Sequence, residues 1–81
     1  KVHGVSFDEA ITVFGDPLLR LSTDTSDANE ERFIAIGRSE KGRDLFVVHC
    51  YRDKVKNDEE IIRIISARKL EKYEKRRLEK L

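Results

Sequence analysis

Several common functional signals are missing from this 81-residue sequence. Its single cysteine, Cys50, cannot form an internal disulfide and stands in an apolar run, where cysteine usually behaves as a small buried hydrophobe. No apolar run approaches the roughly 18 residues that a membrane-spanning helix needs, and the N-terminus has no signal-peptide core. We therefore expect a cytoplasmic protein without a membrane partner.

The sequence also lacks the residue patterns that are typical of metal sites and nucleotide-binding sites. The two histidines, His3 and His49, are far apart, and the acidic residues do not have calcium-loop spacing. There is no glycine-rich loop that would cradle a phosphate. We expect no metal site and no cofactor, which disfavours metal-dependent nucleases and nucleotide hydrolases.

What the sequence does have is a concentrated positive charge at its end. Residues 68–81 contain seven Lys or Arg and three Asp or Glu, whereas residues 1–67 contain ten and thirteen. The balance is +4 in the tail and −3 before it, which the whole-chain charge of +1 conceals. Such a basic segment is typical of a surface for phosphates or for an acidic partner protein.

The length allows one domain, and a domain of this size is only marginally stable without help from a partner or a second copy.

At the N-terminus, Ser6 and Glu9 fit a capping box, and Phe7, Ala10, Ile11 and Phe14 give a short helix an apolar face. Residues 15–17 end this helix. The first four residues, with Gly4 last, are typical of a helix end, so we expect residues 1–81 to be one N-terminally truncated domain with an exposed seam. A homodimer through that seam is one expectation.

The remaining chain predicts an antiparallel sheet and a second helix, so the fold class is α+β. Leu18–Leu21 predicts a short strand and Ser22–Asn29 a loop. Arg32–Gly37 and Leu45–Tyr51 predict a hairpin whose loop contains Gly42, and Glu60–Ile65 predicts a further strand. Ser66 then predicts the N-cap of a basic helix with a narrow apolar stripe of Leu70, Tyr73, Leu78 and Leu81.

Three segments together resemble one known family. HGVSFDEA at His3–Ala10, ERFIAIGRSEKGRDLFVVH at Glu31–His49 and IRIISARKLEKYEKRR at Ile62–Arg77 resemble the BrnT family of toxins. The resemblance implies a RelE-like ribonuclease toxin of a type II toxin–antitoxin module, with N-terminal helices against an antiparallel sheet of three to four strands. It also implies a BrnA-like ribbon-helix-helix antitoxin as partner. Family members begin with a strand and a full first helix, which this sequence lacks, and the linker at Asp53–Asp58 is longer than usual.

Metal-independent RNA cleavage needs a base for the 2′-OH, cations for the phosphorane and an acid for the leaving oxygen. Arg68, predicted at a helix start, is the first candidate for stabilising the transition state. Arg63 stands among apolar residues in the predicted strand, on the face of Ile61 and Ile65, where it either acts on RNA or lies along an edge. Tyr73 is a candidate acid or base-stacking platform, although the ordinary reading places it in the core as part of the stripe with Leu70 and Leu78.

Two further residues are candidates for acid–base chemistry. Glu60 is a possible general base, and His49 a possible acid or base, although a lone histidine in an apolar strand is more often structural. Cations that would hold the RNA backbone include residues on the predicted hairpin and helix, namely Arg32, Arg43, Lys69, Arg76 and Arg77. Of these, Arg32 and Arg43 are assigned by the resemblance alone, and a solvated role is the ordinary alternative for all such residues.

Two functions follow as hypotheses. The first is a toxin endoribonuclease that cleaves mRNA and inhibits translation. The second is a non-catalytic module whose basic helix binds RNA phosphates or an acidic antitoxin surface. The formation of fragments with cyclic phosphate ends distinguishes them, because only the first produces them.

Overall fold

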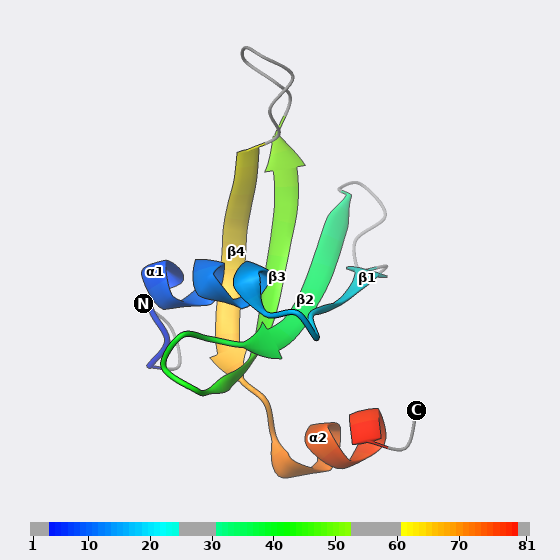
Figure 1. Ribbon diagram of the computed structural model, residues 1–81. Helices are drawn as coiled ribbons and strands as arrows, with labels where there is room; N and C mark the ends of the chain where they lie inside the picture. The colour runs from blue at the N-terminus through cyan, green and yellow to red at the C-terminus, as the bar shows by residue number, and fades with distance from the viewer. Residues whose placement is uncertain (1–3, 25–30, 53–60, 80–81) are drawn as a thin grey trace.

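The computed structural model describes residues 4–24, 31–52 and 61–79 (Figure 1). In chain order the elements are α1 (Phe7–Ala10), a 3₁₀ helix η1 (Ile11–Gly15), β1 (Arg20–Asp24), β2 (Arg32–Arg38), β3 (Asp44–Arg52), β4 (Ile61–Lys69) and α2 (Lys72–Glu79). The strands form one antiparallel sheet in the order β1-β2-β3-β4. This arrangement confirms the predicted α+β class with an N-terminal helix and a basic C-terminal helix.

The hydrophobic core lies between the N-terminal helices and one side of the sheet, which we call the helix-bearing face (Figure 1). Gly37 lets η1 approach β2, because a Cβ there would stand 3.2 Å from the Val13 carbonyl oxygen. A fully buried valine or leucine contributes about 1.5–3 kcal/mol. The fully buried apolar residues are Val5, Ala10, Val13, Ala35, Leu45, Val47 and Ala67.

The predicted hairpin of β2 and β3 is confirmed, with strands one residue longer at the ends facing the loop. Gly42 has a φ of 80°, a left-handed conformation that a glycine adopts without strain. The Gly42 N–H donates to the Ser39 carbonyl at 2.9 Å, and the Ser39 N–H donates to the Arg43 carbonyl at 2.8 Å. The loop residues therefore close the hairpin with backbone hydrogen bonds.

The N-terminal helix begins as predicted and then departs from the prediction. Ser6 Oγ accepts the Glu9 N–H at 3.1 Å, which confirms half of the capping box. A capping box also predicts that the Glu9 carboxylate accepts the Ser6 N–H, and this half is wrong, because that carboxylate accepts from Arg43 instead. The apolar face is also misassigned in part, since Phe7 and Ile11 remain 43% and 41% exposed.

The first strand lies later than predicted. β1 begins at Arg20, and Leu18 outside it is 82% exposed. Ser22–Asp24, predicted as the start of a loop, pair with Phe33 and its neighbours in β2. The remainder of the predicted loop, residues 25–29, lies outside the described residues.

The boundary between the last strand and helix is a second correction. β4 continues to Lys69 and α2 begins only at Lys72, so Ser66 is not a helix N-cap and Arg68 is not at a helix start. The reason is tertiary: β3 is nine residues long and supplies pairing partners for β4 as far as Lys69. Cys50, expected to be buried, is half-buried.

None of the described helices is long and apolar enough to cross a membrane.

Candidate functional site

A bulge in β4 decides which side chains reach the other side of the sheet, which we call the open face. Ser66 pairs with Val48 and Ile64 pairs with His49, so Ile65 is an extra residue in the register. A bulge of this kind shifts the alternation of side chains by one residue. Regular alternation along the strand predicts Ser66 on the face of Ile64, and this prediction is wrong, because the bulge places the two residues on opposite faces.

The bulge places Arg63 and Arg68 on the same face. They are five residues apart and would face opposite sides of a regular strand, but Arg63 pairs with Cys50 and Arg68 pairs with Phe46, which alternate regularly on β3. Four β3 residues span about 13 Å. The two arginines thus share the open face, but they stand well apart along it.

At the level of Arg68, one residue from each strand forms a row across the open face. Arg20 pairs with Ile36, Ile36 with Phe46, and Phe46 with Arg68. Three strand spacings of about 4.8 Å separate the outer two backbones by roughly 14 Å. We call these four residues the arginine row: two apolar side chains with an arginine at each end.

Arg68 is held in place from two sides. Its guanidinium carbon lies 4.3 Å from the centre of the Phe46 ring, a cation–π contact. Its two terminal nitrogens donate to the two carboxylate oxygens of Glu74 on α2, at 2.8 and 2.9 Å. This fork-to-carboxylate geometry gives Arg68 the orientation that bidentate binding of a phosphate also requires.

Glu74 also caps the helix from which it comes. Its Oε1 accepts the Glu71 N–H at 2.8 Å, the bond by which the third residue of a helix reaches back to its N-cap. The hydrogen bonds from Arg68 are the largest cause that lowers the pKa of Glu74 to about 2. Glu74 is therefore ionised at neutral pH and neutralises Arg68 in the free protein.

Tyr73 and Lys69 lie beside Arg68. Together with Leu70 and Glu71 these three line an open depression of about 610 Å³ where β4 passes into α2. Tyr73 is 60% exposed, so the reading that places it in the core is wrong. A phenol next to an arginine in an open depression is suited to donating a proton or to stacking on a base.

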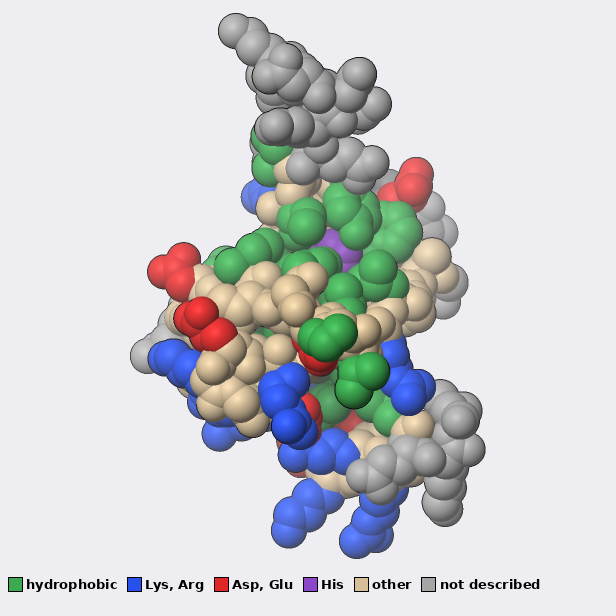
Figure 2. Space-filling view, viewed as in Figure 1, with side chains coloured by type: hydrophobic (Ala, Val, Ile, Leu, Met, Phe, Trp, Pro, Cys, Tyr) green, Lys and Arg blue, Asp and Glu red, His purple; other side chains and the backbone are tan. Residues whose placement is uncertain are grey.

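The remaining candidate cations are dispersed. Arg76 and Arg77 are exposed on α2, and Figure 2 shows the Lys and Arg side chains gathered toward that end of the molecule. Arg32 begins β2, lies opposite Asp24 in the register of β1 and β2, and is half-buried. Arg63 is exposed at the same end of the open face as Arg32.

Arg43 has a structural position away from the open face. Its Nε donates to Glu9 Oε2 at 2.8 Å and its terminal nitrogen pairs with Glu9 Oε1, while Ser39 Oγ donates to Glu9 Oε2 at 2.7 Å. These hydrogen bonds lower the pKa of Glu9 to about 2, Arg43 being the largest cause. The group ties α1 to the β2–β3 loop, and Arg43 is engaged in it.

His49 lies on the helix-bearing face, opposite to Arg68. It is fully buried among the rings of Phe14, Phe33 and Tyr51, with its Nε2 3.3 Å from the Tyr51 hydroxyl. Burial lowers the pKa of His49, so the imidazole is neutral at physiological pH. The structure thus separates His49 from Tyr73 and Arg68, and Glu60 lies outside the described residues.

Two residues of this surface escaped the sequence reasoning. Glu74 carried a readable signal, because an acid three residues after Glu71 in a basic segment has capping-box spacing. Arg20 carried none, since only the register of β1 places it across from Ile36. Within the described residues, no three His, Cys, Asp or Glu side chains come together as a metal site would need.

Comparison with known proteins identifies one family. The family of the ribonuclease toxin BrnT, of type II toxin–antitoxin systems, matches residues 1–74. No curated protein matches the chain. Since the match covers most of the sequence, the chain belongs to the BrnT family of ribonuclease toxins, whose members act with an antitoxin partner and have RNA as target.

Proposed function

We propose that this BrnT-family chain is a cytoplasmic, metal-independent endoribonuclease that cleaves RNA and thereby inhibits translation. The observation that carries the proposal is the geometry of Arg68, which is fixed by Phe46 and Glu74 beside an exposed Tyr73. Arg68 would stabilise the phosphorane formed when a 2′-OH attacks the neighbouring phosphate, and Tyr73 would protonate the leaving oxygen. Glu60 stays the candidate base.

The other cations would bind the RNA backbone. Arg63 and Arg32 stand at one end of the open face, while Lys69, Arg76 and Arg77 lie around α2. An RNA strand that follows the open face would meet cations at both ends. Arg43 contributes to folding in this proposal, because Glu9 occupies its guanidinium.

The decisive test is RNA cleavage in EDTA by the wild-type protein and by Arg68→Ala. We expect fragments that end in a 2′,3′-cyclic phosphate, and a loss of about 10²-fold or more in Arg68→Ala, as when one donor to a transition-state anion is removed. Glu74→Ala is the matched comparison, because it breaks the same ion pair and loosens the same helix but keeps the arginine. Its loss should be smaller than tenfold.

One observation favours the second function, a non-catalytic binding module. Glu74 occupies both terminal nitrogens of Arg68, so a phosphate must displace a carboxylate before it reaches that residue. Intact RNA after incubation with a wild-type protein that nevertheless binds RNA would favour this function. An equal loss of cleavage in Arg68→Ala and Glu74→Ala would remove Arg68 from the chemistry.

We also propose that a BrnA-like ribbon-helix-helix antitoxin covers the basic surface around α2. Arg76, Arg77 and Tyr73 are exposed there, so acidic and apolar partner side chains have matching groups to contact. Isothermal titration and size exclusion with the antitoxin test this. Glutamine at Arg76 and Arg77 should weaken the complex, and the absence of heat and of a complex would contradict the proposal.

A homodimer through the N-terminal seam is a separate proposal. Phe7 and Ile11 on the N-terminal helices and Leu21 on β1 are 43%, 41% and 57% exposed, and Figure 2 shows hydrophobic side chains gathered on this side of the molecule. Sedimentation equilibrium should show a dimer that Ile11→Glu dissociates. A monomer at all concentrations would rule the proposal out.

A further inference from the structure

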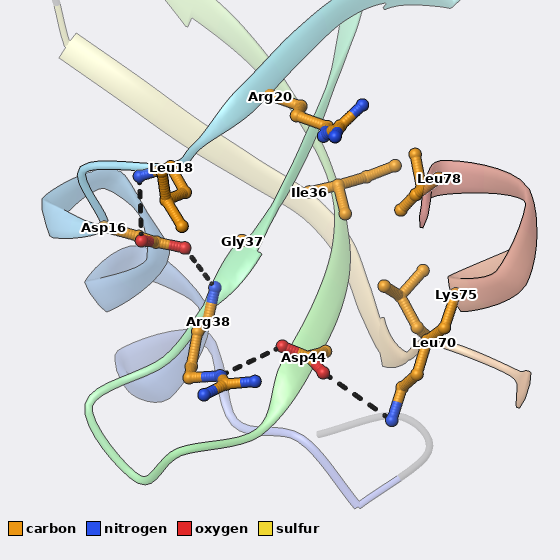
Figure 3. Close-up of a pocket in the computed structure, with 10 residues that line it drawn as sticks. All are labelled: Asp16, Leu18, Arg20, Ile36, Gly37, Arg38, Asp44, Leu70, Lys75 and Leu78. Atoms are coloured by element: carbon orange, nitrogen blue, oxygen red, sulfur yellow. Dashed lines mark hydrogen bonds and ion pairs between the residues drawn. The ribbon is translucent and has the colours of Figure 1, made fainter. Parts of the chain in front are cut away.

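A second cleft lies between α2 and the β1–β2 end of the arginine row. It encloses about 480 Å³, within the usual size range of small-molecule sites. Ile36 lines it from the sheet, and Leu70 and Leu78 line it from α2 (Figure 3). These apolar walls suit a flat ring held between a strand and a helix.

The charged groups at the rim differ in whether they are already paired. Asp16 accepts the Leu18 N–H at 3.0 Å and the Arg38 N–H at 2.8 Å. Asp44 accepts from Arg38 Nε at 3.2 Å and lies 3.6 Å from Lys75 Nζ. Both acids of the cleft are thus occupied by groups of the protein itself.

Arg20 is different. No hydrogen bond or ion pair of its guanidinium occurs within residues 4–24, 31–52 and 61–79, and the residue is exposed. Figure 3 shows its side chain extending over Ile36 toward Leu78. A free guanidinium fork above an apolar wall is suited to a ring that presents two hydrogen-bond acceptors on one edge.

The cleft adjoins the depression beside Arg68 at Leu70. Arg20 and Arg68 are the two ends of the arginine row, roughly 14 Å apart by strand spacing, and Leu70 lines both the cleft and the depression beside Arg68. A strand of RNA whose phosphate meets Arg68 can therefore cross Phe46 and Ile36 and place a neighbouring nucleotide at Arg20.

We propose that the cleft between α2 and β2 is a nucleobase subsite in which Arg20 selects guanine. The base lies against Ile36 and Leu78, and the Arg20 fork donates to guanine O6 and N7, the acceptor pair that arginine most often reads. This inference rests on the proposed function, because it assigns base selection to the same RNA-cleaving surface.

The test uses short 2′-O-methyl RNA oligomers, which cannot be cleaved by 2′-OH attack, with guanine or adenine at one varied position. We expect the methyl NMR signals of Ile36, Leu70 and Leu78 to shift on binding, and the guanine oligomer to bind roughly tenfold tighter. Arg20→Lys keeps the charge but loses the fork, so it should erase this ratio. Lys41→Ala, a charge removal on the exposed β2–β3 loop, should preserve it.

The outcomes separate the inference from the function on which it rests. Binding that leaves the Ile36 and Leu78 methyl signals unchanged, or a guanine ratio that survives in Arg20→Lys, overturns the subsite even if the protein cleaves RNA. Shifts and a ratio that Arg20→Lys erases, in a protein that never cleaves natural RNA, overturn the ribonuclease and leave the subsite standing.

Discussion

Glu9 shows how much of the N-terminal packing depends on one side chain. Its carboxylate joins Arg43 and Ser39 to α1, and the residue is 3% exposed. Replacing it with glutamine would leave the Arg43 guanidinium without its anion, which is a recognised cause of large destabilisation. We expect Glu9→Gln to lower the melting temperature by at least about 5 °C. The exposed neighbour Asp8, changed to asparagine, provides the matched loss of one charge.

The same residue has a pH signature. The pKa of Glu9 is lowered from 4.5 to about 2 by its partners, so the unfolded chain binds the proton more readily. The stabilisation from ionised Glu9 is therefore complete above about pH 4.5 and is lost as the pH falls from there toward 2. Glu9→Gln should flatten the decline of melting temperature in this window. If the melting temperature of Glu9→Gln declines as steeply as that of the wild type, then groups other than Glu9 cause the decline.

At the scale of the element, Glu74 both caps α2 and attaches it to β4 by its pairing with Arg68. Two substitutions separate these roles. Glu74→Gln keeps an acceptor for the Glu71 N–H but loses the charge, which should lower the free energy of unfolding of α2 by about 0.5–1 kcal/mol. Glu74→Ala loses both the acceptor and the charge and should lower it by about 1 kcal/mol more. Amide hydrogen exchange in α2 should rise in that order while exchange in β3 stays unchanged.

The control is Lys75→Ala, which removes the weaker contact to Asp44 at 3.6 Å. An exposed single ion pair of this kind contributes little, so exchange in α2 should change less than in either Glu74 variant. Equal exchange in all three proteins would show that α2 is held by its leucines and not by Glu74.

The elements themselves follow from local pattern, but their ends and partners do not. Alternating apolar residues and Gly42 are sufficient to predict the β2–β3 hairpin, because a turn and its strands are local features. The end of β4 depends on pairing with β3, and Ser66 therefore looked like a helix cap although it is a strand residue. The bulge at Ile65 has the same origin, so the shared face of Arg63 and Arg68 was not readable from spacing.

The candidate site divides in the same way. Arg68 and Tyr73 are near in sequence, and the structure places them together at one depression. The contacts that decide whether an arginine is free to bind RNA are made by residues far away in the sequence. Glu9 contacts Arg43 across 34 residues, and Arg20 joins the arginine row only through two strand pairings. A sequence with two histidines and many cations gives no local sign of which ones a fold will bury or pair.

At the scale of the whole molecule, RNA binding by a chain of net charge +1 depends on where its charges stand. Glu9 and Glu74 neutralise Arg43 and Arg68, whereas Arg76 and Arg77 are exposed on α2. Each phosphate that a cation neutralises on a single strand contributes about 0.7 to the slope of log K against log salt concentration. Changing both exposed arginines to glutamine should reduce that slope by up to about 1.4.

Fluorescence anisotropy of a labelled RNA between roughly 50 and 200 mM salt gives this slope directly. Lys41→Gln is the single-charge control on the β2–β3 loop, and it should leave the slope unchanged. If the double variant binds more weakly at every salt concentration with the wild-type slope, then its arginines support the fold of α2 and do not contact phosphate. A reduced slope with unchanged amide exchange in α2 would instead show that the helix contacts RNA directly. The concentration of positive charge on α2 would then compensate for the small net charge of the whole chain.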